Sequence, residues 1–343
     1  MRCNFHHTMF LFLSPIKRNV DKGFIPRHHN FIVLLLNYFI LLCGVPLRAT
    51  LLFAFFFSLT SFQTLPSLVA EFSFGNFHNP KGISIDPSGI IYVADTGRNL
   101  LVRFNSSGDS TGEVGGYGWG DFQFDQPYDV CATNGIEIYV ADYSNNRIER
   151  FDRTLANVAT LYTEGSDVES EQFGYPSGVA VSRLGDLFIC DDENIRIMKV
   201  NTFSNVERTF GAYGEGTGSL TMPRQIEIGP HDEIFVSDKG SPADESSKSG
   251  GRIAVYDNFG NYVRSIGVGI LHDPSGIGLD ENKIGVCDSD TLYFFKLDGD
   301  MLAKFSTEDI FGVTINQFND VSISGDKVYI LTDKNVVVAR SNF

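Results

Sequence analysis

The sequence predicts an all-β fold, a six-bladed β-propeller with four-stranded blades, from three observations. One pattern recurs six times, about 45 to 50 residues apart, between Glu71 and Phe343. Each copy reads as several short strands separated by turns, which is typical of a propeller blade. The sixth copy is one strand short, and a matching segment stands before the first copy. Because such repeats cannot bury their faces alone, we expect the six to close into a ring.

Two marker residues frame each copy. A proline opens the first strand in five copies, and Phe318 takes its place in the sixth. These opening markers are Pro80, Pro127, Pro176, Pro223, Pro274 and Phe318. The closing markers are Asp95, Asp142, Asp191, Asp238, Asp288 and Asp333. The distance between the two markers is 15 residues in every copy but the fifth, where it is 14.

The residues between and after the markers predict the four strands of a blade in order. In the first strand a large apolar residue alternates with a small one, as in residues 82–85, which indicates a period of two. The second strand is β-branched and aromatic, as in residues 90–93. The third begins near Asn99 in the first copy, and the fourth includes segments such as 262–266.

The outer strand of the last blade is predicted to come from the other end of the repeat region. Residues 71–75 match 207–211 and 263–267, which are fourth strands of other copies. We therefore expect the strand 71–75 to pair with the last strand of the chain. That pairing would close the ring and remove an exposed sheet edge.

Three stretches of this sequence resemble NHL repeats. They are residues 80–86, 91–99 and 139–152, the last reading Tyr-Val-Ala-Asp-Tyr-Ser-Asn-Asn-Arg-Ile-x-Arg-Phe-Asp. The glycine-rich segment 115–122 is similar to that family's connection between blades. The resemblance implies a six-bladed propeller of the secreted bacterial type. It implies little about activity, because the family includes interaction modules, sensor domains, RNA binders and a few enzymes.

Residues 1–70 differ from the repeats and are predicted to form an N-terminal extension, with the propeller at 71–343. Two apolar runs, 31–43 and 51–62, are each shorter than the roughly 20 residues that span a bilayer. The second run fits a signal peptide with Ala70 at its cleavage point, and the alternative is a membrane anchor made of both runs. We therefore expect a secreted, periplasmic or cell-envelope protein that touches a membrane only through this segment, if it is uncleaved.

The repeat region is strongly acidic. Taking the six basic residues and one acid of residues 1–70 from totals of 27 and 42 leaves 21 basic and 41 acidic residues, a net charge of −20. Nucleic-acid binding needs a basic surface, so no nucleic-acid partner is expected. Three cysteines remain, Cys131, Cys190 and Cys287, and we expect them to be small buried fillers.

Specificity is expected where the repeats differ, at the residues just after the opening markers. These begin the innermost strands and should line one mouth of the central channel. The predicted ligand-binding residues are Trp119, Tyr128, Asp129, Arg224, Gln225, Glu227 and Asp320. Glu227 replaces a small residue of the other copies, so it needs a partner such as Arg224, and a catalytic acid or base is the alternative. The polar loop 241–251 follows Asp238 on the same rim.

Metal chemistry has weaker support in the sequence. A zinc site from His78, Asp125 and His272 is one alternative, but no His-x-His spacing appears. The closing aspartates are interpreted as turn residues, whose carboxylates accept hydrogen bonds from N–H groups two residues on. The alternative is that they form a ring of carboxylates that binds a cation. We expect no cofactor and no metal. The predicted function is a non-catalytic binding propeller that recognises a protein or a polysaccharide by its loop rim. The alternative is a metal-dependent lyase or lactonase-like enzyme with its site in the channel.

Overall fold

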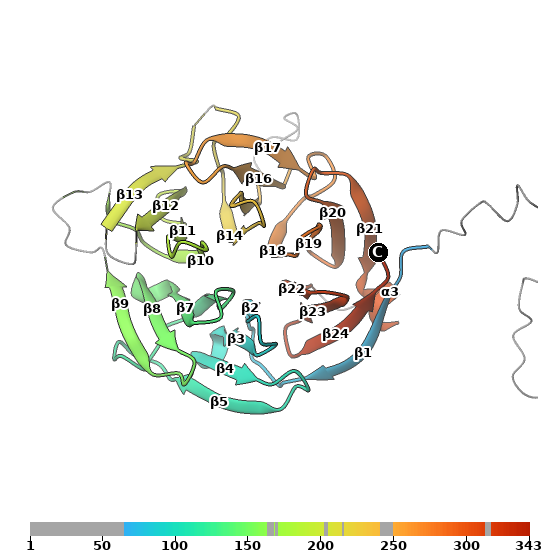
Figure 1. The fold of residues 1–343 in the computed structure, drawn as a ribbon, viewed down its shortest axis with the longest axis horizontal. Helices are drawn as coiled ribbons and strands as arrows, with labels where there is room; N and C mark the ends of the chain where they lie inside the picture. The colour runs from blue at the N-terminus through green and yellow to red at the C-terminus, as the bar shows by residue number, and fades with distance from the viewer. Residues whose placement is uncertain are drawn as a thin grey trace, which may run out of the picture. The chain divides into compact units, whose positions relative to one another are not determined.

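Six antiparallel sheets of four strands surround a common centre, with one strand of each sheet innermost (Figure 1). The computed structural model describes residues 65–162, 168, 171–201, 205–214, 216–240, 250–312 and 317–343. These residues belong to one compact unit, Leu65–Phe343. The prediction of an all-β, six-bladed propeller with four-stranded blades is confirmed.

Five blades follow the chain from their innermost to their outermost strand. Blade one contains β2 Gly82–Ile85, β3 Ile91–Asp95, β4 Leu100–Phe104 and β5 Ser110–Gly115. Blade two contains β6 Pro127–Cys131, β7 Glu137–Asp142, β8 Arg147–Asp152 and β9 Asn157–Tyr162. Blade three contains β10 Pro176–Val181, β11 Leu187–Asp191, β12 Arg196–Asn201 and β13 Asn205–Phe210. Blade four contains β14 Pro223–Ile228, β15 Ile234–Asp238, β16 Arg252–Tyr256 and β17 Tyr262–Ile266. Blade five contains β18 Pro274–Leu279, β19 Lys283–Asp288, β20 Thr291–Lys296 and β21 Met301–Ser306.

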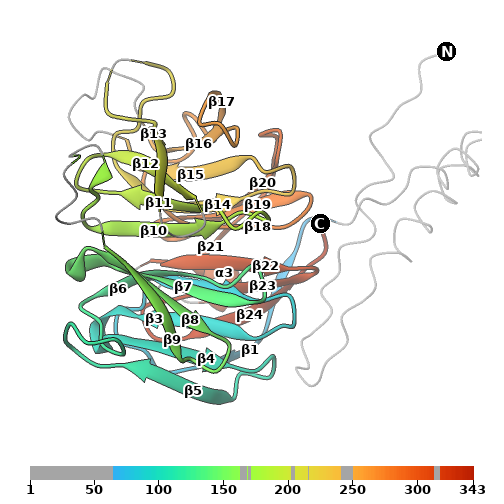
Figure 2. The same ribbon diagram turned by 60° about the vertical axis from the view of Figure 1, so that its left-hand side comes forward.

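The sixth blade joins the two ends of the described chain. It contains β22 Asp320–Ser324, β23 Lys327–Leu331, β24 Val336–Ser341 and, outermost, β1 Leu68–Phe74. Strand β1 runs antiparallel to β24, with Leu68 opposite Ser341 and Phe74 opposite Val336. Figures 1 and 2 show β1 alongside β24. The predicted closing strand is therefore confirmed, and it begins three residues earlier than the sequence pattern indicated.

The core lies between neighbouring blades rather than inside any one of them. Tyr92 and Leu101 of blade one pack with Val130 and Val140 of blade two, and the other blade pairs repeat this arrangement. All five residues of β3 are buried, because both faces of the sheet are covered by neighbours. Cys131, Cys190 and Cys287 are buried and free, as the filler interpretation predicted.

Short helical turns lie in the connections of the described ranges. They are η1 Thr96–Arg98, η2 Tyr143–Asn145 and α3 Thr307–Phe311. Helix α3 is preceded by Ser306, whose hydroxyl accepts a bond from the Asp309 N–H while the Asp309 carboxylate accepts one from the Ser306 N–H. The pattern of strands did not predict this helix, since five residues are too few to show a helical period.

Residues 1–64 lie outside the described residues, so the predicted targeting segment stays a prediction. No helix of the described ranges has both the length and the apolar character required to cross a bilayer. The opening and closing markers lie together on one face of the ring, which we call the marker face. It carries the loops after the closing aspartates and the linkers that lead into each blade.

Candidate functional site at the channel mouth

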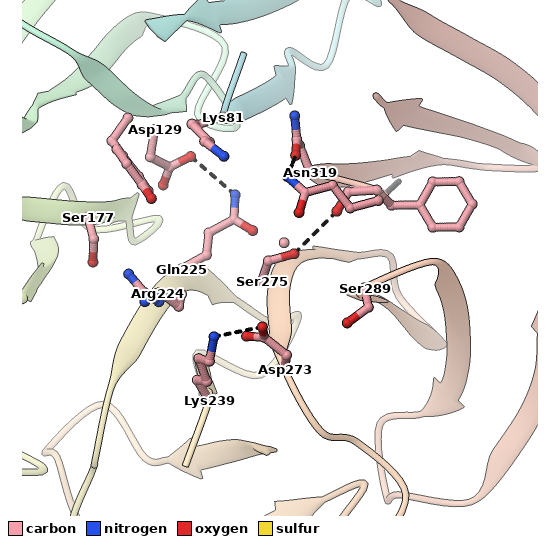
Figure 3. Close-up of a pocket in the computed structure, with 14 residues that line it drawn as sticks. Lys81, Asp129, Ser177, Arg224, Gln225, Lys239, Asp273, Ser275, Ser289 and Asn319 are labelled. Atoms are coloured by element: carbon pink, nitrogen blue, oxygen red, sulfur yellow. Dashed lines mark hydrogen bonds and ion pairs between the residues drawn. The ribbon is translucent and has the colours of Figure 1, made fainter. Parts of the chain in front are cut away.

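A cavity of about 290 Å³ opens on the marker face at the centre of the ring. Every blade contributes the residue directly after its opening marker, as the sequence pattern predicted. These lining residues are Lys81, Tyr128, Ser177, Arg224, Ser275 and Asn319. Figure 3 shows such side chains, drawn from different blades, gathered around one opening. Asp129 and Gln225 also line the cavity and form its floor.

The floor depends on an alternation between blades that the sequence analysis missed. Blades one, three and five have glycine two residues after the marker, at Gly82, Gly178 and Gly276. Blades two, four and six have Asp129, Gln225 and Asp320. A Cβ on Gly82 would lie 2.7 Å from the Asp129 Cα, and one on Gly276 would lie 2.4 Å from the Asp320 Cα. The glycines therefore let neighbouring inner strands approach closely enough for the polar side chains to meet at the centre.

Each of these three polar side chains binds the following blade. Asp129 Oδ2 accepts a hydrogen bond from the Val179 N–H at 2.9 Å, and Asp320 Oδ2 accepts one from the Ile83 N–H at 2.8 Å. Gln225 Oε1 accepts one from the Ile277 N–H. Asp129 and Asp320 also accept from the next N–H of their own strands, at 2.8 and 2.7 Å.

The Gln225 amide connects the two acids. Its Nε2 donates to Asp129 Oδ1 at 3.2 Å and to Asp320 Oδ2 at 2.9 Å. Because Oε1 accepts from a backbone N–H, the orientation of the amide is determined by its partners. We call Asp129, Gln225 and Asp320 the central plug. Figure 3 shows the Gln225 amide pointing toward Asp129.

Burial of the plug changes the protonation of its acids. Burial raises the pKa of Asp129 to about 7, against the opposing effect of its bonds from Val179, Gln225 and Val130. Burial and then the charge of Asp129 raise the pKa of Asp320 well above its usual range. Two carboxylates that share one amide cannot both stay charged in a desolvated site at low cost. Burial therefore favours the protonated form of both plug acids.

Glu227 lies two residues beyond Gln225 on β14, deeper in the channel. Burial, followed by the charge of Asp129, raises the pKa of Glu227 to about 8. The predicted ion pair with Arg224 is not formed among the described residues. Three residues of extended strand span about 10 Å, which places the guanidinium at the mouth and the carboxylate below the plug. The Arg224 guanidinium lies instead 2.9 Å from the Met222 Sδ.

Asp320 also differs from its predicted place. It was expected at the mouth, but it is fully buried beneath Gln225 and does not line the cavity. Of the seven predicted ligand-binding residues, Tyr128, Asp129, Arg224 and Gln225 line the cavity. Asp320 supports the floor, and Glu227 and Trp119 lie elsewhere.

The sequence analysis did not identify Lys239 and Asp273 as mouth residues. The Lys239 Nζ lies 2.7 Å from Asp273 Oδ2, and both line the cavity. Only their positions in the repeat could have predicted a place at the mouth, because Lys239 follows a closing aspartate and Asp273 precedes an opening proline. The predicted loop 241–251 lies outside the described residues except at Gly250 and Gly251.

Trp119 lies in the linker between blades one and two, and its side chain is 59% exposed. The linker is held by the buried side chain of Arg147, whose guanidinium donates to the Trp119, Gly120 and Gln123 carbonyls. Arg147 in turn pairs with the closing aspartate Asp142 at 2.7 Å. The exposed indole is thus carried by a tightly anchored backbone.

Three tyrosines on the marker face have neighbouring, mutually tilted rings, and Tyr128 among them lines the mouth. The ring centroids of Tyr128 and Tyr143 are 4.9 Å apart, and those of Tyr143 and Tyr175 are 5.2 Å apart. The Tyr143 hydroxyl donates to Asp192 Oδ2 at 3.1 Å. Burial raises the pKa of Tyr143 to about 12, so this hydroxyl keeps its proton at neutral pH.

The closing aspartates are structural, but the predicted local turn is wrong in its main contact. In five blades the carboxylate accepts the N–H of the residue two before the opening marker: His78, Asp125, Gly174, Thr221 and His272. These partners are 17 residues away in four blades and 16 in the fifth. The marker spacing of 15, and 14 in blade five, therefore reflects the contact between each linker and its own blade.

The alternative zinc site does not assemble. His78, Asp125 and His272 lie in the linkers of blades one, two and five, and the His272 side chain is 83% exposed. Within the described ranges, no three His, Cys, Asp or Glu side chains are grouped to hold a metal ion.

Comparison with known proteins agrees with the fold. Residues 77–104 match the NHL repeat. Protein brain tumor of Drosophila melanogaster is 28% identical over 137 residues, which is 39% of this chain and 12% of that protein. A probable peptidyl-alpha-hydroxyglycine alpha-amidating lyase of Caenorhabditis elegans is 27% identical over 167 residues, which is 47% of this chain and 45% of that protein. The chain thus spans less than half the length of these relatives.

Solved structures resemble the chain in fold alone. Virginiamycin B lyase from Staphylococcus aureus superposes with a TM-score of 0.54 at 11% identity, covering 80% of this chain and 99% of the lyase. Hydrazine synthase of Kuenenia stuttgartiensis gives a TM-score of 0.53 at 14% identity, covering 78% of this chain and 96% of that structure. This chain is a six-bladed β-propeller that carries an NHL repeat.

Proposed function

We propose that this NHL-repeat propeller is a non-catalytic binding protein that recognises a protein or a polysaccharide by its marker face, in a secreted or cell-envelope setting. The central plug is the observation that carries the proposal. Its two acids accept hydrogen bonds from backbone N–H groups and from Gln225. Acids engaged in this way close the channel beneath the mouth, and the shallow polar cavity above them fits recognition better than bond cleavage.

The aromatic residues of the marker face support the same proposal. Trp119, Tyr117 and Tyr213 are 59%, 72% and 71% exposed, and all three lie in linkers between blades. Exposed tryptophan and tyrosine side chains are enriched among the residues that dominate binding energies. Their place on the marker face, which also carries the cavity, suits a ligand larger than the cavity itself.

The test compares substitutions on the marker face with one on the opposite face of the ring. Trp119→Ala and Tyr128→Ala should each weaken binding to fractionated secreted proteins and polysaccharides, measured by biolayer interferometry, with an unchanged melting temperature. Leu184→Ala is the matched control, because Leu184 is 81% exposed in the turn between β10 and β11, away from the marker face. The proposal would be contradicted if Leu184→Ala abolished binding while Trp119→Ala and Tyr128→Ala left it intact. It would also be contradicted if no fraction bound the protein.

A metal-dependent lyase is the second candidate, favoured by the raised pKa of Glu227 in the channel and by the lyase named above that is 27% identical. The donor set of the described residues does not fit a metal, so no reaction step is assigned. Elemental analysis of the purified protein and melting with and without a chelator separate the two candidates. A stoichiometric ion whose removal lowers the melting temperature would favour the lyase.

The proposed export is tested by sequencing the N-terminus of the native protein. Cleavage after Ala70 would remove Leu68 from β1, where its side chain is only 7% exposed. A mature N-terminus between 60 and 71 would support export by a cleaved signal, and retention of residues 31–62 in a membrane fraction would favour an anchor.

A further inference from the structure

Two cationic side chains face the channel mouth without an acidic partner. Lys81 and Arg224 are half-buried, line the cavity, and form no ion pair with the described residues. The repeat region has 41 acidic residues against 21 basic ones, so a basic side chain without an acid is unexpected there. Arg147, Arg196 and Arg252, by contrast, each pair with the closing aspartate of their blade.

The two cations act on one another. Burial and then the charge of Arg224 lower the pKa of Lys81. Two positive charges held close together in a partly desolvated cavity favour the arrival of an anion. Lys239 belongs to the same blade as Arg224, and its charge is already neutralised by Asp273 at 2.7 Å. Lys81 of blade one and Arg224 of blade four therefore face the mouth from opposite sides of the ring, and neither has an ion pair among the described residues.

Asp129 lines the same cavity but forms no ion pair with Lys81 or Arg224. Its Oδ1 accepts from Val130 and Gln225, and its Oδ2 accepts from Val179. Burial raises the pKa of Asp129 to about 7, which favours its uncharged form, so it offsets only part of the positive charge. Among the described residues no acid pairs with the two cations, which leaves the open side of the mouth for an anionic ligand.

We propose that Lys81 and Arg224 bind a carboxylate of an acidic peptide segment in a protein partner, which enters the channel mouth from the marker face. This inference rests on the proposed binding function. Arginine pairs with a carboxylate through two parallel hydrogen bonds, and lysine adds a point charge. A cavity of about 290 Å³ accommodates one or two side chains rather than a folded domain.

The packing of Tyr128 favours a peptide over an acidic polysaccharide. Of the described tyrosines, only Tyr128 lines the cavity, where it is half-buried with its ring plane tilted by 30° against that of Tyr143. It therefore offers a sugar ring less surface to stack on than a freely exposed ring would. The exposed Trp119 and Tyr213 lie in separate linkers, where they can contact the flanks of an extended segment.

The experiment uses a random seven-residue peptide array and an oligogalacturonate series, probed with the full chain. We expect the bound peptides to be enriched in Asp and Glu. Affinities of the best peptides should fall roughly tenfold or more in the Lys81→Gln/Arg224→Gln double variant, as loss of a charge-assisted hydrogen bond predicts. The matched control is Arg183→Gln/Lys304→Gln, which removes the same charge from exposed positions away from the mouth. Its affinities should stay within about twofold of the parent, and circular dichroism checks that both variants fold.

The outcomes separate this inference from the function on which it rests. Peptides without acidic enrichment, bound equally by the double variant, would overturn the carboxylate assignment and leave the binding function standing. Oligogalacturonate binding that depends on Lys81 and Arg224, with no peptide bound, would overturn the peptide assignment. No binding to either set would overturn the inference, and the fractionation test above would then decide the function separately.

Discussion

At the scale of single residues, the centre of this ring is organised by one amide. Gln225 donates to both buried acids and accepts from the Ile277 N–H, so all three of its bonds cross between blades. A carboxylate in its place would add a third acid, and a hydrocarbon would leave the Ile277 N–H without its acceptor and the two acids with backbone donors alone. The chemistry of a primary amide, with two donors and one acceptor group, is what the position requires.

The first prediction concerns this amide. Gln225→Ala should lower the free energy of unfolding by about 3 kcal/mol, because the Ile277 N–H loses its acceptor and the two buried acids each lose one of their donors. Gln225→Glu should be less stable than the parent at pH 8 and closer to it at pH 5, since acid protonates the added carboxyl. Urea denaturation at both pH values measures this. Parent-like stability of Gln225→Ala would mean that the plug contributes little.

The second prediction concerns pH. Burial raises the pKa of Asp129 to about 7 and that of Glu227 to about 8, so the folded state holds protons that the unfolded chain has lost. Stability should therefore fall as the pH rises from about 4.5, just above the ordinary pKa values of the unfolded carboxyls, to about 8, and then level off. Each proton held contributes a slope of about 1.4 kcal/mol per pH unit within that window.

Glu227→Gln isolates one of these protons. The variant should lose part of the pH slope between about 4.5 and 8, measured by urea denaturation at several pH values. Glu281→Gln is the control, because Glu281 is exposed and should leave the slope unchanged. A slope in Glu227→Gln equal to that of the parent would show that this carboxyl titrates normally.

At the scale of elements, β1 is the strand whose place matters most. It pairs with β24 over its whole length, apart from an irregularity between Ala70 and Phe72. Leu68 packs into the core beside Phe294 and Phe318 of the neighbouring elements, and Phe74 stacks 5.0 Å from Phe104 of blade one. The strand thus connects the last blade to both of its neighbours.

The third prediction tests the part of β1 that precedes Glu71. Leu68→Ala should lower the free energy of unfolding by about 2–4 kcal/mol, as is usual for a buried leucine. Val69→Ala is the control on the same strand, because Val69 is 60% exposed, and should change it by less than about 0.5 kcal/mol. Equal effects at the two positions would indicate that Leu68–Ala70 do not pack as part of the strand.

At the scale of the whole molecule, closure makes six similar sheets one folding unit. Each blade buries its faces only against its neighbours, so an opened ring would expose two of those faces at once. The two ends of the described chain lie close together, since the Asn342 N–H donates to the Ser67 carbonyl at 3.3 Å. The pairing of β1 with β24 therefore joins these two ends within one blade.

The fourth prediction tests closure. Deleting residues 71–75 should lower the melting temperature by roughly 10 °C or more, because the β1 pairing and its buried side chains are lost. A circular permutant is the control: Phe343 is joined to Leu65, and new termini are placed between Ser106 and Ser107 in the β4–β5 turn. It keeps every strand and should melt close to the parent. A deletion variant that melts like the parent would show that the pairing of β1 with β24 is not needed to keep the ring closed.

The sequence alone determined the number of blades, the order of strands and the closing strand. Those features repeat, and a repeat of alternating residues specifies both strand and register. It also located the mouth, because the residues after Pro80, Pro127 and Pro223 vary where the scaffold does not. The burial of small residues such as Cys190 could also be predicted, because they occupy the same position in different copies of the repeat.

Only the tertiary structure decided which mouth residues meet. Gln225 lies 96 residues after Asp129 and 95 residues before Asp320 along the chain. Their contact depends on the closed ring and on glycines in the alternate blades, which no single repeat reveals. The separation of Glu227 from Arg224 likewise follows from the direction of β14 along the channel. Local patterns specify each blade, whereas the distances across the centre exist only once all six blades have closed.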